Sequence, residues 1–274
     1  MVFGVALVDG SAKSKGRNPD EKPVAAHRLA HKRKGFKMKR LMMLLLVALA
    51  LPATAFAGIN NSAGATCMQT GFYRDSINLT AAQIGGDVTG DLDATGCDIG
   101  VYYGPGAKGS VTKATITNAK YFGVVNYRGK VNVKNSTISQ IGNTPLDGTQ
   151  HGVGIFYTTE ETPGGAISGN AKGTISGNIL HSYQKGGITV RGVGASATIE
   201  RNTLTGVGHV DFIAQNGIQV SFGSSATVKG NTVSGHWYTP DSTEACGLLF
   251  YQAGKVNAKA NTLFDNEVAT YVTP

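Results

Sequence analysis

The chain has 274 residues, enough for one or two domains, and a formal net charge of +8. The positive balance belongs to its start, because residues 1–40 hold eleven Lys and Arg against three Asp and Glu, while residues 41–274 hold fourteen of each sign. A chain that is neutral beyond its first 40 residues lacks the overall basic character of proteins that bind nucleic acid or anionic membranes. We therefore expect neither kind of partner.

Residues 38–57 have the layout of a secretory signal peptide. Met38 is followed by two basic residues, an unbroken apolar run at 41–51, a proline, and Ala-Phe-Ala at 55–57. The apolar run is too short for a transmembrane helix, which needs about 20 residues. We expect translation to start at Met38, residues 1–37 to be a non-native N-terminal extension, and the mature protein to be secreted, periplasmic or on the cell surface.

The rest of the chain repeats. Gly-Ile-Thr-Val at 187–190, Gly-Ile-Gln-Val at 217–220 and Gly-Leu-Leu-Phe at 247–250 are each followed by a second unit that contains Asn-Thr. Apolar residues alternate within each unit, which predicts short strands with one buried face. The leading aliphatic residues recur every 25–35 positions, and we expect them to stack as one buried column: Ile99, Val124, Val153, Ile188, Ile218 and Leu248.

Short strands of this kind cannot enclose a core alone, but stacked rungs share one. The pattern predicts an all-β, single-stranded parallel β-helix of about six to seven rungs at 97–274, preceded by a cap and an irregular first rung at 58–96. A column of asparagines, one at the bend of each second unit, is expected to hydrogen-bond along the stack. Its members are Asn178, Asn202, Asn231 and Asn261, with Ser136 and Ala114 in the two earlier rungs.

The Gly-Ile-x-Val and Asn-Thr-x-x-Gly pattern over residues 97–265 resembles the repeats of the pectin-lyase-like superfold. This resemblance implies a right-handed helix. The superfold hosts pectate lyases, polygalacturonases, rhamnogalacturonases, alginate epimerases, phage tailspikes and non-enzymatic surface proteins, so it does not imply one activity. No enzyme family's motif is matched: the Asn-Thr pairs lack a following acid, no Asp-Asp pair occurs, and Gly-His-Val-Asp at 208–211 shares only a His and an Asp with the epimerase motif.

One outward-facing column is rich in aromatic residues. Three positions after each leading aliphatic residue stand Tyr102, Tyr127, Phe156, Arg191, Ser221 and Tyr251. Aromatic rings stacked along the axis suit the apolar faces of sugar rings, and arginine suits their carboxylates. We expect Tyr102, Tyr127, Phe156, Arg191, Tyr251 and Trp237 to bind substrate. The alternative is that a loop, for example residues 158–165, covers this face.

The histidines of the mature chain all lie in the connections between rungs, where sites are commonly built. For a lyase or C5-epimerase acting on uronate sugars, Lys185 or Arg191 would neutralise the carboxylate, His209 or Tyr157 would act as base, and Asp211 would orient His209. The alternative is that these polar side chains only solvate loops. No local spacing suggests a metal site, and no cofactor is expected; Ca²⁺ stays open without an acidic cluster to bind it.

Two functions follow. The first is a secreted protein that binds an acidic extracellular polysaccharide, with cleavage or epimerisation as an open extension. The alternative is a non-catalytic surface or adhesion solenoid that acts through protein or glycan contacts, in which the aromatic side chains serve packing or self-association. For either function, a homo-oligomer formed through the solenoid ends is an open option. Cys67 and Cys97 lie 30 residues, one rung, apart, so we expect them to form a disulfide and Cys246 to be free and buried.

Overall fold

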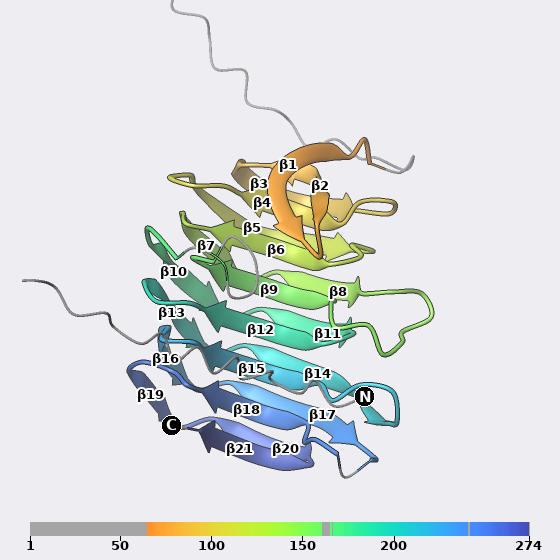
Figure 1. Ribbon diagram of the computed structural model, residues 1–274, viewed down its shortest axis with the longest axis vertical. Coiled ribbons are helices and arrows are strands. Elements are labelled where there is room, and N and C mark those ends of the chain that lie inside the picture. Colours follow the sequence, from red (N-terminus) through yellow and green to blue (C-terminus); the bar gives the residue numbers. More distant parts are fainter. Residues whose placement is uncertain (1–64, 161–164, 166, 241, 274) are drawn as a thin grey trace, which may run out of the picture. The chain divides into compact units, whose positions relative to one another are not determined.

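A computed structural model of the chain describes residues 65–160, 165, 167–240 and 242–273. The predicted extension at 1–37 and signal peptide at 38–57 lie outside these residues. The described part contains 21 strands, and no helix in it is long and apolar enough to cross a membrane. Figure 1 shows the strands stacked as successive rungs of a parallel β-helix, as the repeat predicts.

Nine strands form the first sheet, in the order β1-β2-β4-β6-β9-β12-β15-β18-β21. Their bounds are β1 (Met68–Arg74), β2 (Ile77–Ile84), β4 (Ile99–Tyr103), β6 (Phe122–Tyr127), β9 (Val153–Thr158), β12 (Gly186–Arg191), β15 (Asn216–Ser221), β18 (Cys246–Tyr251) and β21 (Val268–Thr273). All neighbours are parallel except β1 and β2, which are antiparallel.

The second sheet covers the other two sides of the solenoid. The long strand β5 (Lys108–Thr117) pairs with β7 along its first half and with β8 along its second half, and so joins two faces. One face continues with β7 (Lys130–Lys134), β10 (Ala171–Ser176), β13 (Ala195–Glu200), β16 (Ser225–Lys229) and β19 (Val256–Lys259). The other continues with β8 (Thr137–Ile141), β11 (Ile179–Tyr183), β14 (Thr203–Val210), β17 (Thr232–Tyr238) and β20 (Thr262–Asn266), and β3 (Gly86–Asp93) pairs with β5.

The predicted aliphatic column is right at four of its six members. Val124, Ile188, Ile218 and Leu248 share one register, but Val101 and Ile155 occupy the places expected for Ile99 and Val153. Ile99 and Val153 stand two positions earlier than Val101 and Ile155, on the outer side of the sheet, and belong to a separate apolar cluster.

A column of glycines sets this register. It immediately precedes the buried aliphatic residues and consists of Gly100, Gly123, Gly154, Gly187, Gly217 and Gly247. A Cβ on Gly187 would lie 2.8 Å from the carbonyl oxygen of Gly217 in the next rung and would also clash with Leu204. Since these glycines touch the neighbouring rung, they fix which residue of each strand faces the core.

The N-terminal piece is more regular than predicted. Strands β2 and β3 form a first rung in register with β4 and β5, and β1 lies antiparallel against β2. The predicted disulfide is confirmed, because Cys67 and Cys97 are bonded with their Cα atoms 5.4 Å apart. Cys246 is free and buried, also as predicted.

The asparagine column is confirmed as a hydrogen-bonded ladder. The Oδ1 of Asn202 accepts from both the backbone N–H and the Nδ2 of Asn178, at 3.0 and 2.9 Å, and its Nδ2 donates to the Ile175 carbonyl. Asn231 bonds Asn202 in the same way, and Asn261 bonds Asn231. The ladder is buried through Asn231, so each amide satisfies backbone groups that water cannot reach.

We predict that Asn202→Ala lowers the free energy of unfolding by about 2–3 kcal/mol, because it removes the acceptor of two buried Asn178 hydrogen bonds and the donor to the Ile175 carbonyl. Denaturant unfolding measures the loss. Asn257→Ala, an exposed asparagine on β19, serves as the control and should change little. Equal losses in the two variants would contradict a stabilising ladder.

Candidate functional site

The expectation that aromatic side chains form an exposed sugar platform is wrong for three of them. Tyr102, Tyr127 and Phe156 are only 4%, 5% and 3% exposed. They do lie on the outer side of the first sheet, where they form a second apolar cluster together with Phe122 and residues of β1 and β2. Tyr102 and Tyr127 are therefore packed beneath other side chains, and Phe156 keeps only a small exposed fraction.

Strand β1 provides the cover. Its Phe72 packs on Tyr127, Tyr102 and Phe122, with ring centroids 5.0, 5.9 and 6.3 Å away. The alternative weighed from the sequence, a cover formed by residues 158–165, lies partly outside the described residues. The predicted single column is also wrong, because Tyr102 and Phe156 share one register while Tyr127 and Arg191 share another. The sequence did not indicate that the chain folds back antiparallel before the first rung and places an aromatic residue over Tyr102 and Tyr127.

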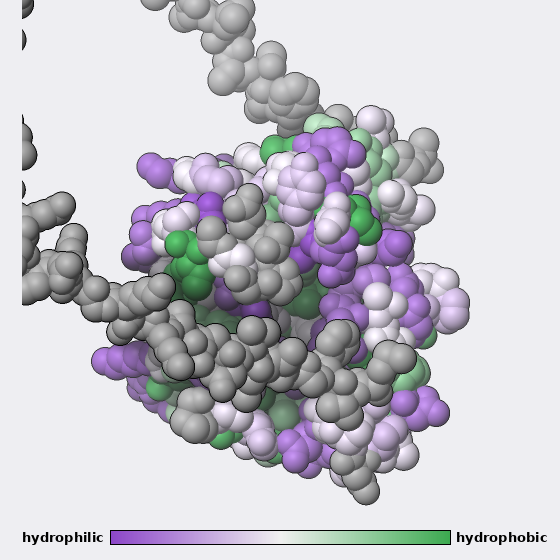
Figure 2. Space-filling model, in the orientation of Figure 1, coloured by the Kyte–Doolittle hydropathy of each residue, from purple (hydrophilic) through white to green (hydrophobic). Residues whose placement is uncertain are grey.

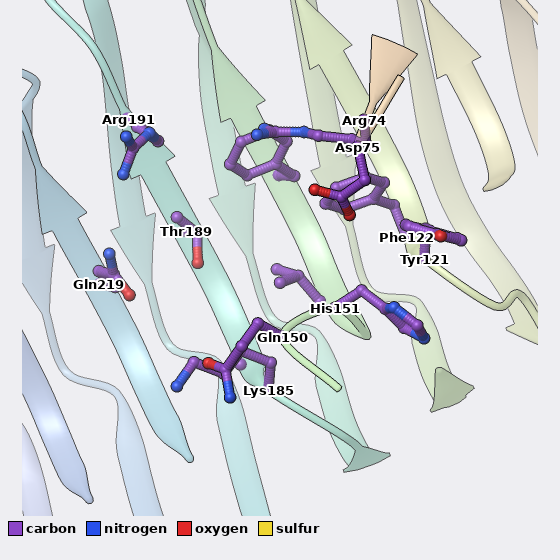
Figure 3. Close-up of a pocket in the computed structure, with 13 residues that line it drawn as sticks. Arg74, Asp75, Tyr121, Phe122, Gln150, His151, Lys185, Thr189, Arg191 and Gln219 are labelled. Atoms are coloured by element: carbon purple, nitrogen blue, oxygen red, sulfur yellow. The ribbon is translucent and has the colours of Figure 1, made fainter. Parts of the chain in front are cut away.

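Where this cover ends, the first sheet carries a groove with a volume of about 230 Å³. Its floor follows one outward-facing register, Phe156, Thr189 and Gln219, on three successive strands. Figure 2 shows hydrophobic surface set back between hydrophilic side chains on this face. Around the floor stand polar and aromatic side chains, all labelled in Figure 3: Arg74, Asp75, Tyr121, Gln150, His151, Lys185 and Arg191.

Arg74, the last residue of β1, is the most unusual of these. Its side chain extends over the ring of Phe156 toward Arg191 (Figure 3), with the guanidinium carbon 4.8 Å from the ring centroid. The residue is only 8% exposed, and its Nε makes no hydrogen bond within the described part of the chain. Burial, and secondarily the nearby Arg191, lower the pKa of Arg74 to about 10. At neutral pH the groove thus contains a buried cation with an unsatisfied donor.

The Arg191 side chain is held by Glu160 and Phe222. Its Nε donates to the carboxylate of Glu160, which is 2% exposed and follows β9. The guanidinium carbon lies 3.7 Å from the ring centroid of Phe222. Glu160 forms its ion pair with Arg191, so it does not directly pair with the charge of Arg74.

The loop between β8 and β9 carries Gln150 and His151 and forms one rim of the groove. The buried Gln184 holds this loop: its Oε1 accepts from the Asn143 N–H and its Nε2 donates to the Thr149 carbonyl, at 2.9 and 2.7 Å. His151 stacks on Tyr121, with ring centroids 4.3 Å apart. Burial, then the neighbouring Lys120, lowers the pKa of His151, so this imidazole is neutral at pH 7.

Lys185 stands at the foot of the same groove. Its Nζ donates to the Ala214 carbonyl at 2.8 Å, and burial lowers the pKa of its amine to about 8. The group is therefore charged at neutral pH but gives up its proton more easily than an ordinary lysine. It is the groove's best-suited side chain for either ion pairing or proton transfer.

The structure separates the predicted catalytic residues. Lys185 and Arg191 both line the groove, but the exposed His209 and Asp211 lie outside it. No hydrogen bond joins His209 to Asp211 in the part of the chain that the structure describes; the His209 ring stacks instead on Trp237, 4.5 Å away. The expected convergence of the four side chains is wrong, because β14 and β17, which carry His209 and Trp237, belong to another face.

The remaining predicted residues also differ from expectation. Tyr157 cannot be a base, because it is fully buried, donates to the Val131 carbonyl at 2.7 Å, and has its pKa raised by burial. Tyr251 is 37% exposed but packs on Phe222 outside the groove, and the Trp237 indole donates to Asp265. Among the described residues no three His, Cys, Asp or Glu side chains are grouped closely enough to hold a metal ion.

Comparison with known proteins gives the fold. Residues 164–273 match the family model described as "Right handed beta helix region", which confirms the expected handedness. Among solved structures, an alginate lyase from Paenibacillus sp. str. FPU-7 superposes with a TM-score of 0.40 at 15% sequence identity, over 69% of this chain and 76% of that one. No curated protein matches the sequence.

We predict that Glu160→Gln destabilises the protein by about 2–3 kcal/mol, because it leaves Arg191 and Arg74 near each other without the buried carboxylate. Thermal or denaturant unfolding measures this. The control is Glu200→Gln, which removes an acid paired with the exposed Arg201 and Lys229 and should have little effect. A fully stable Glu160→Gln variant would show that Glu160 does not balance the two arginines.

Proposed function

We propose that the groove on the first sheet binds the carboxylate of an acidic extracellular polysaccharide, a chain of uronate sugars. The observation that carries this proposal is Arg74, a buried cation that lines the groove and whose Nε has no hydrogen-bond partner among the described residues. Leaving a buried donor unpaired costs free energy, which a ligand carboxylate would recover by accepting a charge-assisted hydrogen bond.

The rest of the lining supports a sugar acid rather than a simple anion. Thr189 and Gln219 continue the floor with groups that can hydrogen-bond hydroxyls, and the Tyr121–His151 stack offers a flat aromatic wall. The volume of about 230 Å³ lies below the range of about 300–1,000 Å³ typical of pockets that enclose whole small ligands. The groove therefore suits one residue of a chain whose remainder lies outside.

Cleavage or epimerisation requires a cation at the carboxylate and a base for the adjacent proton. In an enzymatic form of this proposal, Arg74 takes the first role and Lys185, with its pKa lowered to about 8, takes the second. A screen of uronate polysaccharides for the ultraviolet absorbance of unsaturated products tests for a lyase, and exchange of the C5 proton with solvent deuterium tests for an epimerase.

The first prediction concerns Arg74 and measures binding of trigalacturonate by calorimetry. Arg74→Met keeps the apolar packing over Phe156 but removes the charge, and should weaken binding by about 2 kcal/mol, about thirtyfold in Kd. Arg201→Met removes an exposed arginine outside the groove and should bind like the wild type. Unchanged affinity of a folded Arg74→Met variant would contradict the site, and altered self-association in place of sugar binding would favour the adhesion function.

The second prediction concerns pH. Uronate carboxylates stay ionised from neutral to alkaline pH, so affinity should fall as pH rises through and above about 8, where Lys185 loses its proton. Lys185→Arg keeps its charge across this range and should abolish the decline up to about pH 9, below the pKa of about 10 of Arg74. If wild-type affinity stays constant between pH 7 and about pH 9, below the pKa of about 10 of Arg74, Lys185 does not contribute to anion binding.

A further inference from the structure

The face formed by β5, β7, β10, β13, β16 and β19 carries an unexpected row of cations. Lys108, Lys130 and Lys172 are direct register partners on three adjacent parallel strands. All three are exposed, and each begins or nearly begins its strand, next to the corner that this face shares with the first sheet. Adjacent strands are about 4.8 Å apart, so the three ammonium groups are repeated at about that interval along the axis.

This arrangement is electrostatically unfavourable unless an anion lies on it, since like charges directly opposite each other on neighbouring strands repel. None of the three lysines forms an ion pair within the described residues, where the ion pairs are Arg191–Glu160, Arg201–Glu200 and Lys229–Glu200. For Lys108 and Lys130 the sequence explains this lack of ion pairs, because no Asp or Glu occurs between Asp98 and Asp147, a stretch with six Lys and Arg. The acid nearest in register, Asp87, accepts a hydrogen bond from Ser110.

The neighbouring outward column has a different chemistry. Beside the lysines run uncharged side chains that donate and accept hydrogen bonds: Ser110, Asn132, Thr174, Thr198 and Thr227. A row of cations next to a row of hydroxyl and amide groups matches a polymer that has both carboxylates and hydroxyls on each residue. These two columns contain no aromatic side chain on which a nucleic acid base could stack.

We propose that Lys108, Lys130 and Lys172 form a second binding surface, on which an acidic polysaccharide chain lies along the solenoid axis. The inference rests on the proposed function for the chemistry of the ligand, and adds that recognition depends on chain length. The axial repeat of the lysines is comparable to the length of one pyranose residue in an extended chain, so successive uronates meet successive lysines. The groove takes one sugar residue, and the lysine column takes a further stretch of polymer.

The test compares a long polygalacturonate chain with trigalacturonate on the full-length protein. Lys108→Ala, Lys130→Ala and Lys172→Ala together should weaken binding of the polymer roughly tenfold, as three exposed charge contacts of ordinary strength would do, and should reduce its sensitivity to salt. Binding of trigalacturonate in the groove, which is the binding that Arg74→Met weakens, should be unchanged. The matched control is the triple change of Lys229, Lys255 and Lys259 to Ala, which removes the same charge from the same face at its other end.

Three results would overturn the inference: unchanged polymer affinity in the first triple variant, equal losses in the two triple variants, or duplex DNA of matched charge binding the wild type as tightly as polygalacturonate. Failure of the groove gives a different result. If the polymer binds and requires the lysine column, but neither polymer nor trisaccharide binding responds to Arg74→Met, the lysine surface stands and the groove does not.

Discussion

The stacking of strands in register is the constraint on which the rest of this structure depends. Six glycines of the first sheet leave room for the backbone of the next rung, and the asparagine ladder holds the bends of the second sheet. With the register fixed, every outward position becomes a straight column of side chains about 4.8 Å apart. The floor of the groove and the lysine column are both such columns. The chemistry of each is therefore set by the residue that each rung places at one register position.

The N-terminal strand decides which of these columns is available to a ligand. By folding back across the first sheet, β1 buries an aromatic surface that the solenoid alone would expose. The residue directly before β1 is Cys67, and its disulfide with Cys97 anchors the start of the strand. The same strand ends in Arg74, whose guanidinium lies over the last covered ring. The cover and the proposed anion site are therefore two consequences of one strand, and the groove lies at the boundary of the cover.

The sequence predicted the repetitive features and missed those that depend on a single contact. Period and alternation were enough for the fold, the asparagine ladder and the disulfide. The same two patterns placed Ile99 and Val153 in the column that Val101 and Ile155 occupy. Aliphatic residues stand on both sides of Gly100 and of Gly154, and only packing between rungs shows which of them faces the core. Arg74 was missed because it lies outside the repeat. The sequence grouped His209 and Asp211 with Lys185 because all three lie in connections between rungs. The structure places His209 and Asp211 outside the groove, at β14 of another face.

The central claim is that the buried cation of β1 receives a carboxylate. A crystal structure of the protein with trigalacturonate measures this most directly. We expect one sugar residue in the groove, with a carboxylate oxygen within hydrogen-bonding distance of the Arg74 guanidinium and the ring above Thr189 and Gln219. A trisaccharide bound elsewhere on the solenoid, or one whose carboxylates point away from Arg74, would contradict the account.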